Sequence, residues 1–158
     1  MIQCFDKFSQ KRRHRYFPFV TSNLDIGCGG SYDIRGKIVG IDKEGTRGNK
    51  LGYQDNSFRT VTMFAVIEHI NRKDMKELQK EIARVLKKDG QLIITTPARF
   101  SHPLLKVLAF FNLISRKEIN EHVTYYNKDN ILDVFSCFKL IGYKRFDIFN
   151  QWFLLKSF

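Results

Sequence analysis

One short stretch constrains the fold of this chain more than any other: an apolar run that reaches an acid and then breaks into glycines. It reads Leu24-Asp25-Ile26-Gly27-Cys28-Gly29-Gly30. Glycine lets a backbone turn sharply and approach a ligand, because no Cβ stands in the way. In open α/β sheets, such a turn at the carboxyl end of a buried parallel strand is where nucleotide-like ligands bind. We therefore expect an α/β protein with a ligand site at this edge of its sheet.

The next apolar run supports this interpretation and excludes one class of nucleotide-binding enzyme. Residues 38–41 lead directly into Asp42, whose carboxylate can accept hydrogen bonds from two ribose hydroxyls. A nicotinamide-dependent dehydrogenase needs a third glycine three residues after the second, and Tyr32 stands there instead. Taken separately, the glycine turn also fits an ordinary loop, and the acid fits an ordinary strand end.

The middle of the chain has the pattern of a parallel α/β unit. An apolar strand is expected from about residue 59, and the Glu68-His69 pair follows it at the ligand edge of the sheet. An amphipathic helix is expected over about residues 72–87, because its apolar residues recur at helical spacing. An Asp-Gly turn then stops the helix, and residues 91–97 read as another buried strand.

Together these segments resemble the class I S-adenosylmethionine-dependent methyltransferases of the small, type-11 kind. The resemblance covers about residues 20–158. It implies an α/β, Rossmann-like three-layer sandwich whose mostly parallel sheet closes with an antiparallel C-terminal hairpin. It also implies a single methyltransferase-like domain over residues 1–158, with S-adenosylmethionine as the cofactor.

The same match implies which residues contact the cofactor. Asp25 and the glycine turn would hold its methionine end, and Asp42 its ribose. Residues 55–58 and 66–67 would border the adenine and the sulfonium. The full set of implied contacts is Asp25, Gly27, Cys28, Gly29, Gly30, Asp42, Lys43, Asp55, Asn56, Ser57, Phe58 and Val66.

Two intervals in the first half are shorter than in the family. Only ten residues, 27–36, separate the first two expected strands, where the family has a full helix. Sixteen residues, 43–58, precede the next strand, where the family fits a helix and a further strand. We therefore expect about six strands instead of seven. The family's acid near the adenine would fall near Arg47, which is not an acid.

The second half begins with a lid or acceptor segment, expected over residues 98–126. Residues 103–114 form a nearly continuous apolar helical pattern, which indicates burial first. A lid, a membrane-surface helix and a homodimer contact all remain open for it. Beyond it we expect a helix from Asn127, as its N-cap, to about Phe135. The tail, residues 138–145 and 146–155, reads as two antiparallel strands.

Charge and composition bear on the partners. The net charge of +11 would draw the chain toward nucleic acid, anionic lipid or an acidic substrate. Its densest basic cluster, residues 11–15, lies in an N-terminal helical extension expected over residues 1–20. This cluster reads either as a solvated basic face or as a phosphate-contacting arm with neighbouring aromatics. Methyltransferases that act on the base amino groups of nucleic acids carry an Asn-Pro-Pro-Tyr-type stretch after the corresponding strand. The residues that follow residue 64 here do not have this pattern, so nucleic acid is not the favoured acceptor.

The remaining composition gives bounds on location. Cys4, Cys28 and Cys137 are scattered without metal-ligand spacing, so no metal site is expected. No apolar run approaches the length of a membrane span, and the N-terminus lacks the order of a signal peptide. A cytoplasmic location is the resulting expectation.

A base is needed only if the methyl acceptor is a hydroxyl or a protonated amine. His69 and His122 are the candidate catalytic residues, because an imidazole exchanges a proton near neutral pH. The alternative is a purely structural role, in which both histidines only pack or hydrogen-bond a neighbouring backbone. Tyr125 and Tyr126 are expected either to line the acceptor pocket or to pack in the core. The expected function is methyl transfer to a small-molecule, lipid or saccharide acceptor. A non-catalytic binding or scaffold subunit, dependent on a partner, and an RNA-associated methyltransferase are the alternatives.

Overall fold

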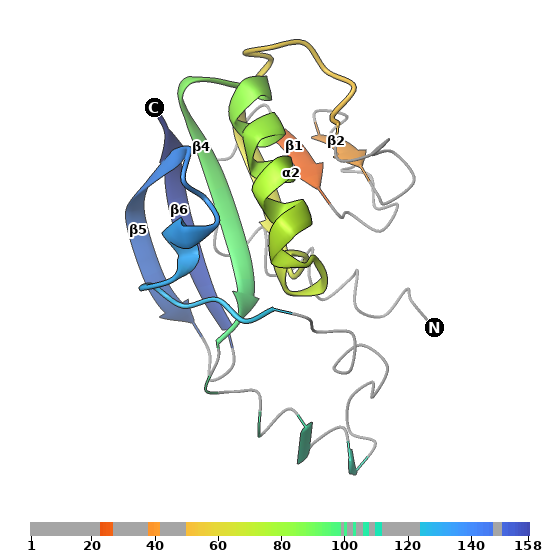
Figure 1. The fold of residues 1–158 in the computed structure, drawn as a ribbon, viewed down its shortest axis with the longest axis vertical. Coiled ribbons are helices and arrows are strands. Elements are labelled where there is room, and N and C mark those ends of the chain that lie inside the picture. The colour runs from red at the N-terminus through yellow and green to blue at the C-terminus, as the bar shows by residue number, and fades with distance from the viewer. Residues whose placement is uncertain are drawn as a thin grey trace.

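The computed structural model describes residues 23–26, 38–41, 50–98, 100, 103, 106–107, 110–111, 124–146 and 150–158. Its strands form one sheet in the order β2-β1-β3-β4-β6-β5 (Figure 1). The strands are β1 Asn23–Ile26, β2 Ile38–Ile41, β3 Phe58–Phe64, β4 Leu86–Pro97, β5 Phe138–Phe146 and β6 Asn150–Ser157. The helical elements are η2 Ile67–His69, α2 Arg72–Val85 and η4 Ile131–Asp133. The predicted α/β sheet of about six strands is confirmed.

Strand directions also agree with the prediction. β1 pairs in parallel with β2 and with β3, and β3 pairs in parallel with β4. β6 runs antiparallel to both β4 and β5, so the chain closes with the expected antiparallel hairpin. The carboxyl ends of β1, β3 and β4 consequently meet at one edge of the sheet.

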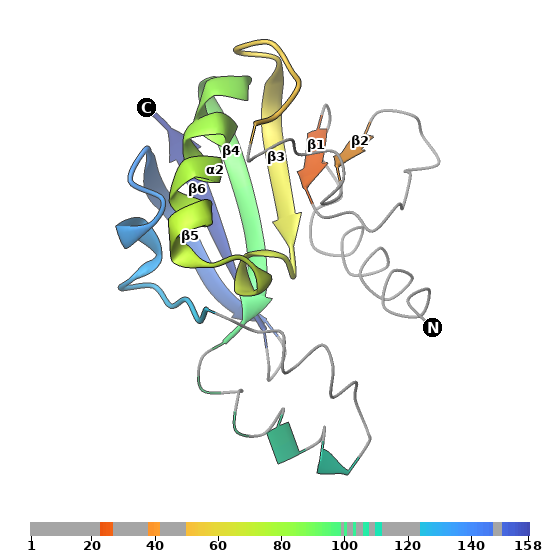
Figure 2. The same ribbon diagram turned by 45° about the vertical axis from the view of Figure 1, so that its right-hand side comes forward.

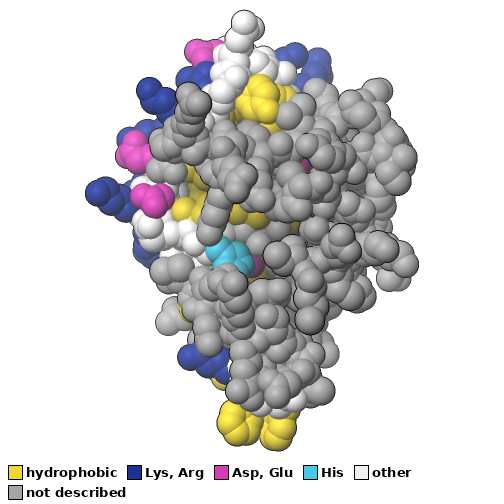
Figure 3. Space-filling view, turned by 90° about the vertical axis from the view of Figure 1, so that its right-hand side faces the viewer, with side chains coloured by type: hydrophobic (Ala, Val, Ile, Leu, Met, Phe, Trp, Pro, Cys, Tyr) yellow, Lys and Arg dark blue, Asp and Glu magenta, His cyan; other side chains and the backbone are white. Residues whose placement is uncertain are grey.

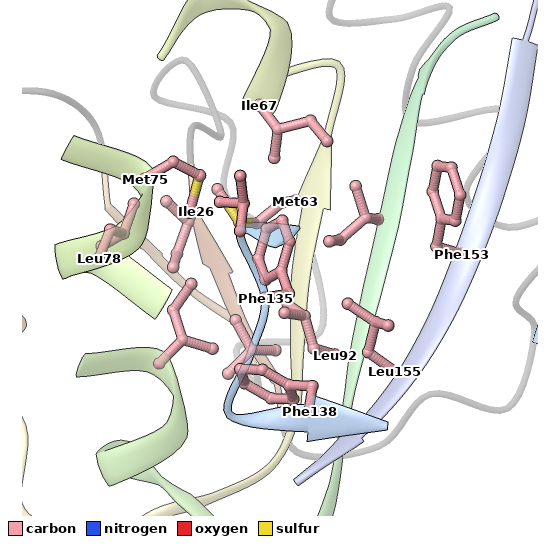
Figure 4. Packing of buried hydrophobic residues seen from close by; sticks show 14 of the residues in the cluster. Ile26, Met63, Ile67, Met75, Leu78, Leu92, Phe135, Phe138, Phe153 and Leu155 are labelled. Atoms are coloured by element: carbon pink, nitrogen blue, oxygen red, sulfur yellow. The ribbon is translucent and has the colours of Figure 1, made fainter. Parts of the chain in front are cut away.

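Helix α2 covers one face of the sheet (Figure 2). Its apolar side, which includes Met75 and Ile82, packs into a single cluster with Leu24, Met63 and Ile94 of the central strands (Figure 4). Each of these five side chains is fully buried. The spacing of apolar residues that predicted the helix therefore also identified the face that packs on the sheet.

The opposite face of the central strands is buried as well. Asp25, Thr62 and Ile93 point away from the α2 cluster, because side chains alternate along a strand, and each is at most 4 % exposed. Burial on both faces is expected for a parallel sheet in a layered α/β fold. The segments that we expected between the first strands, and the extension 1–20, lie outside the described residues.

The junction between α2 and β4 differs from the prediction. Asn71 caps the helix, since its side-chain oxygen accepts a hydrogen bond from the Asp74 N–H at 3.0 Å. The helix ends at Val85, and β4 begins at Leu86 instead of residue 91. Leu86 takes an extended conformation and pairs with Phe58, after which the register shifts. The expected turn before the strand is thus an irregular first part of β4.

The expected helix from residue 127 to residue 135 is wrong. Only the short 3-10 helix Ile131–Asp133 forms there. The Asn127 side chain does cap this segment, accepting hydrogen bonds from the N–H groups of Asp129 and Asn130. The Asn130 side chain in turn accepts from the Asn127 N–H at 2.7 Å. These reciprocal bonds close a tight turn in place of a longer helix.

The expected burial of the apolar segment 103–114 is also wrong at the positions that the structure describes. Val107, Phe110 and Phe111 are exposed by 50 %, 70 % and 64 %. The two phenylalanine rings contact each other edge to face, with centroids 5.4 Å apart. Figure 1 shows the few described residues of this segment, in teal, beyond the carboxyl end of β4. Tertiary placement overrides the apolar pattern here.

Candidate active site

The carboxyl ends of β1, β3 and β4 form the edge at which a ligand site was predicted. Asp25 lies one residue before the end of β1 and opposite Thr62 of β3. The Thr62 hydroxyl donates a hydrogen bond to Asp25 Oδ1 at 2.7 Å, and Asp25 is 1 % exposed. The neighbouring strand therefore fixes the orientation of this carboxylate before any ligand binds.

The exit from β3 is held by a tight turn. Ala65 has φ = 55°, a left-handed conformation that is uncommon for a residue with a Cβ. Its N–H donates to the Thr95 carbonyl of β4 at 2.9 Å. Helix η2 follows directly, so that residues 66–69 turn back across the edge of the sheet.

Glu68 is the buried acid of this turn. It is 2 % exposed, and its Oε2 atom has no hydrogen-bond partner among the described residues. Burial raises the pKa of Glu68 to about 7, although backbone hydrogen bonding and the Thr96 side chain lower it. Thr96 is itself 2 % exposed, near the end of β4. A carboxyl group that titrates near neutrality is thus enclosed between the ends of β3 and β4.

The segment that begins at Thr124 packs against this acid. The Thr124 N–H donates to the Glu68 carbonyl at 3.2 Å. Burial raises the pKa of Tyr125, and the nearby charge of Glu68 raises it further. Tyr126 is fully buried, and its hydroxyl also has no hydrogen-bond partner among the described residues. Glu68 Oε2 and the Tyr126 hydroxyl are thus two buried polar atoms without a hydrogen-bond partner among the described residues.

His69 ends η2 and is half-buried. Its backbone N–H donates to the Val66 carbonyl at 3.0 Å. It is the one histidine among the described residues, and Figure 3 shows histidine atoms reaching the surface beside acidic side-chain atoms. The structure thus brings Asp25, Val66 and His69 of the predicted set to the same edge. No described group of three or more His, Cys, Asp and Glu side chains could hold a metal ion.

Four residues predicted near the adenine lie elsewhere. Asp55, Asn56 and Ser57 precede β3, and Phe58 begins it. They are separated from the Glu68 turn by the length of the strand, about 20 Å at the usual rise per residue. The Asp55 carboxylate is bound by the Arg84 guanidinium at 2.6 Å. The structure does not bring these residues together with Asp25, and they are not part of the site proposed below.

The other predicted site residues lie outside the described part of the chain. They are Gly27, Cys28, Gly29, Gly30, Asp42, Lys43 and His122. Their assignment to the cofactor or to catalysis stays a prediction from the sequence.

The sequence interpretation missed the role of Glu68 as a buried acid. It considered only the two histidines as proton-exchanging groups, because their ordinary pKa lies near neutrality. A signal was available, since Glu68 directly follows the apolar residues Val66 and Ile67 at a strand exit. An acid in such a run is a candidate for burial, and burial moves its pKa into the same range.

This edge of the sheet fits a ligand that carries positive charge. A buried carboxylate with an unpaired oxygen is costly unless a cation or a hydrogen-bond donor compensates it. The sulfonium of S-adenosylmethionine has such a charge, and its ammonium group is a second one. The donor set at the edge therefore agrees with the implied cofactor.

Comparisons with known proteins support a methyltransferase fold. Residues 35–94 match the model of a methyltransferase domain family. A protein of Pyrococcus horikoshii shares 17 % identity, with 99 % of this chain and 91 % of that chain covered and a TM-score of 0.63. A SAM-dependent methyltransferase of Methanosarcina mazei shares 14 % identity, with 91 % and 95 % covered and a TM-score of 0.62.

A third similar structure is a methyltransferase in a complex. The Haloferax volcanii protein, solved with the Trm112 methyltransferase activator, shares 12 % identity, with 96 % and 93 % covered and a TM-score of 0.65. No curated protein is significantly similar in sequence. The described helices include none that is long and apolar enough to cross a membrane. The family model matched over residues 35–94 and the strand order together support a class I, type-11-like methyltransferase fold for this chain.

Proposed function

We propose that this chain transfers a methyl group from S-adenosylmethionine to a small, apolar or lipid-like acceptor at the shared carboxyl edge of β1, β3 and β4. The observation that supports the site is the convergence of Asp25, Glu68 and His69 at that edge. Bound there, the cofactor supplies a methyl group activated by its sulfonium. The protein's task is then to align two reactants and to exclude water.

Each residue at this edge has a separate role in binding or proton transfer. Asp25, fixed by Thr62, orients the methionine end of the cofactor, and Asp42 accepts hydrogen bonds from the ribose. The backbone of the glycine turn at residues 27–30 lets the cofactor approach closely. His69 accepts a proton when the acceptor is a hydroxyl or an ammonium group.

An exposed aromatic group supports an apolar acceptor. Phe100 is exposed by 55 %, and with Val107, Phe110 and Phe111 it follows directly after β4 ends at Pro97. Phe110 and Phe111 contact each other, whereas the Phe100 ring lies 5.1 Å from the Arg145 guanidinium. Single exposed apolar residues are ordinary, so the adjoining pair Phe110 and Phe111 is the feature that supports an interaction surface. This group begins at the edge of the sheet where the cofactor is proposed to bind. An acceptor that arrives from a lipid phase would meet it first.

Calorimetric titration with S-adenosylmethionine tests the site. We expect micromolar binding to the wild type and at least tenfold weaker binding to Asp42→Ala, because a hydrogen-bonded charged group is worth roughly 1.5–3 kcal/mol. Asp129→Ala, at an exposed turn, is the matched control and should bind like the wild type. Absence of binding to the wild type at millimolar cofactor would contradict the proposal.

Vesicle co-sedimentation tests the acceptor class. The wild type should pellet with phosphatidylcholine vesicles containing phosphatidylglycerol, and the double variant Phe110→Ser, Phe111→Ser should stay in the supernatant. Leu132→Ser, at another exposed apolar position, controls for general loss of hydrophobicity. Equal pelleting of the wild type and the double variant would remove the aromatic group as support for a lipid-like acceptor.

A second candidate function is a methyltransferase subunit that needs a protein partner. The described sheet has six strands, as the short interval between β2 and β3 predicted. A similar structure, the Haloferax volcanii methyltransferase, is held in a complex with an activator. If the chain is such a partner-dependent subunit, the isolated chain would not bind the cofactor in the titration, and binding would be restored when the partner is added.

A further inference from the structure

Glu68 is an acid whose burial is incompletely compensated. It is 2 % exposed, and its Oε2 atom is among the two buried side-chain atoms without a hydrogen-bond partner in the described part of the chain. The ion pairs Lys80–Glu77, Arg84–Asp55, Arg84–Glu81 and Lys156–Asp89 do not involve it. Buried carboxyl groups in stable proteins are nearly always paired or hydrogen-bonded, so an unpaired oxygen calls for a physical reason.

The backbone around Glu68 holds the side chain in this place. The left-handed Ala65 turns the chain back at the end of β3, and its N–H is tied to Thr95 of β4. The Glu68 carbonyl accepts the N–H of Thr124 on the other side. A left-handed conformation at a residue with a Cβ costs about 1–3 kcal/mol and persists where the surrounding structure enforces it. The fold thus holds a buried acid at the ligand edge at some cost in stability.

The groups that surround Glu68 are neutral or weakly polar. Thr96 comes from β4, Tyr125 and Tyr126 come from the segment that packs on η2, and His69 is its neighbour within η2. None of these is a permanent cation, although the charge of Arg72 also acts on Tyr126. No cation among the described residues hydrogen-bonds Glu68 Oε2, so a cationic ligand is a candidate to complete the site.

We propose that the Glu68 carboxylate binds the positive charge of the sulfonium of S-adenosylmethionine, and that it thereby distinguishes this cofactor from its neutral product, S-adenosylhomocysteine. The inference rests on the proposed function, since it requires the cofactor to bind at the edge formed by β1, β3 and β4. S-adenosylmethionine and S-adenosylhomocysteine differ at the sulfur atom by one methyl group and one positive charge. A carboxylate beside that charge favours the charged ligand and releases the neutral one.

Proton balance gives this inference a direct signature. Near pH 7 a protonated Glu68 must lose its proton before it can pair with a cation, and the proton goes to the buffer. Binding of S-adenosylmethionine should therefore release up to about half a proton per site at pH 7. Binding of S-adenosylhomocysteine, which lacks the charge, should release none. No covalent step is involved.

The experiment compares both ligands on matched variants by calorimetry. Wild type, Glu68→Gln and Glu77→Gln are titrated at pH 6, 7 and 8, each in phosphate and in Tris buffer. The two buffers differ in ionisation enthalpy, so the difference in measured heat gives the number of protons released. Glu77 is exposed on α2, with 58 % of its side chain accessible, and serves as the control for removing one negative charge.

The expected results separate the two ligands. For the wild type, the preference for S-adenosylmethionine over S-adenosylhomocysteine should grow from pH 6 to pH 8. Glu68→Gln should bind S-adenosylmethionine about tenfold more weakly at pH 8, the effect of roughly 1.4 kcal/mol, while its affinity for S-adenosylhomocysteine stays within about twofold. Its proton release should disappear, and Glu77→Gln should behave like the wild type.

Equal affinities and equal proton release in wild type and Glu68→Gln would overturn the inference, with cofactor binding itself intact. Failure of the proposed function looks different, because the wild type would then bind neither ligand at any pH. A cooperative urea unfolding transition of Glu68→Gln shows that its fold is retained.

Discussion

At the scale of single residues, Glu68 links the site to stability. Its pKa is about 7 in the folded protein against an ordinary value of 4.5, so the folded state binds more protons between these two values. The free energy of unfolding should therefore fall as pH rises from about 4.5 to 7, by up to about 3 kcal/mol. Glu68→Gln should remove this fall and be more stable than the wild type at pH 8. Urea unfolding at pH 5 and pH 8 measures it, and parallel curves for both proteins would contradict the buried acid.

Arg84 is a second residue whose contacts predict a measurable effect. Its guanidinium donates to the Tyr53 carbonyl at 2.8 Å and the Leu51 carbonyl at 2.9 Å, and it pairs with Asp55 and Glu81. Hydrogen bonding to Glu81 and Asp55 raises the pKa of Arg84 and lowers that of Glu81. Arg84 thus ties the segment before β3 to helix α2.

Replacing Arg84 should detach this segment from the helix. Arg84→Ala should lower the free energy of unfolding by about 1–2 kcal/mol, with part of the loss screened by solvent. The exposed pair of Lys80 and Glu77 provides the control, because Lys80→Ala should change stability by no more than about 0.5 kcal/mol. Urea denaturation compares the two variants, and equal effects would show that the Arg84 contacts contribute no more than a surface pair.

At the scale of elements, the irregular start of β4 depends on a glycine. A Cβ at Gly90 would lie 2.7 Å from the Lys87 carbonyl oxygen, a backbone atom that cannot move away cheaply. Gly90→Ala should lower the free energy of unfolding by about 1–3 kcal/mol. At Gly52 nothing lies within 4 Å of an added Cβ, so Gly52→Ala should be neutral or stabilising by up to about 1 kcal/mol. Thermal melting of the two variants gives the comparison, and a neutral Gly90→Ala would show that this turn relaxes.

At the scale of the whole molecule, cofactor binding should stabilise the fold that forms its site. At a cofactor concentration of 100 times its Kd, the free energy of unfolding should rise by about 2.7 kcal/mol. For a chain of this length that corresponds to roughly 5–10 °C in melting temperature. Differential scanning fluorimetry with and without S-adenosylmethionine measures the shift. At the same cofactor concentration Asp42→Ala should lose about half of this shift or more, and an equal shift in both proteins would place the cofactor elsewhere.

Much of the architecture could be predicted from local patterns. The strands expected at about residues 22–26 and 37–41, the helix expected from the spacing of Met75 and Ile82, and the two C-terminal strands are all confirmed by the structure. The spacing of apolar residues indicates which face of a helix or strand is buried. This spacing can be read from neighbouring positions along the chain, so these elements are predictable from local sequence. The shortened intervals also predicted a sheet of about six strands, because sixteen residues between two strands are too few for a helix, a further strand and their loops.

The sequence by itself therefore determined a mostly parallel sheet of about six strands, helix α2, the closing hairpin and the edge at which Asp25 lies. Only the tertiary structure decided which side chains meet at that edge. Glu68 is buried because Ala65 adopts a left-handed turn held by β4, and residues 55–58 are excluded because they lie at the other end of β3. Phe110 is exposed although its surroundings in the chain are apolar. Each of these outcomes depends on contacts between segments distant in the chain, and hydrophobic periodicity contains no information about such contacts.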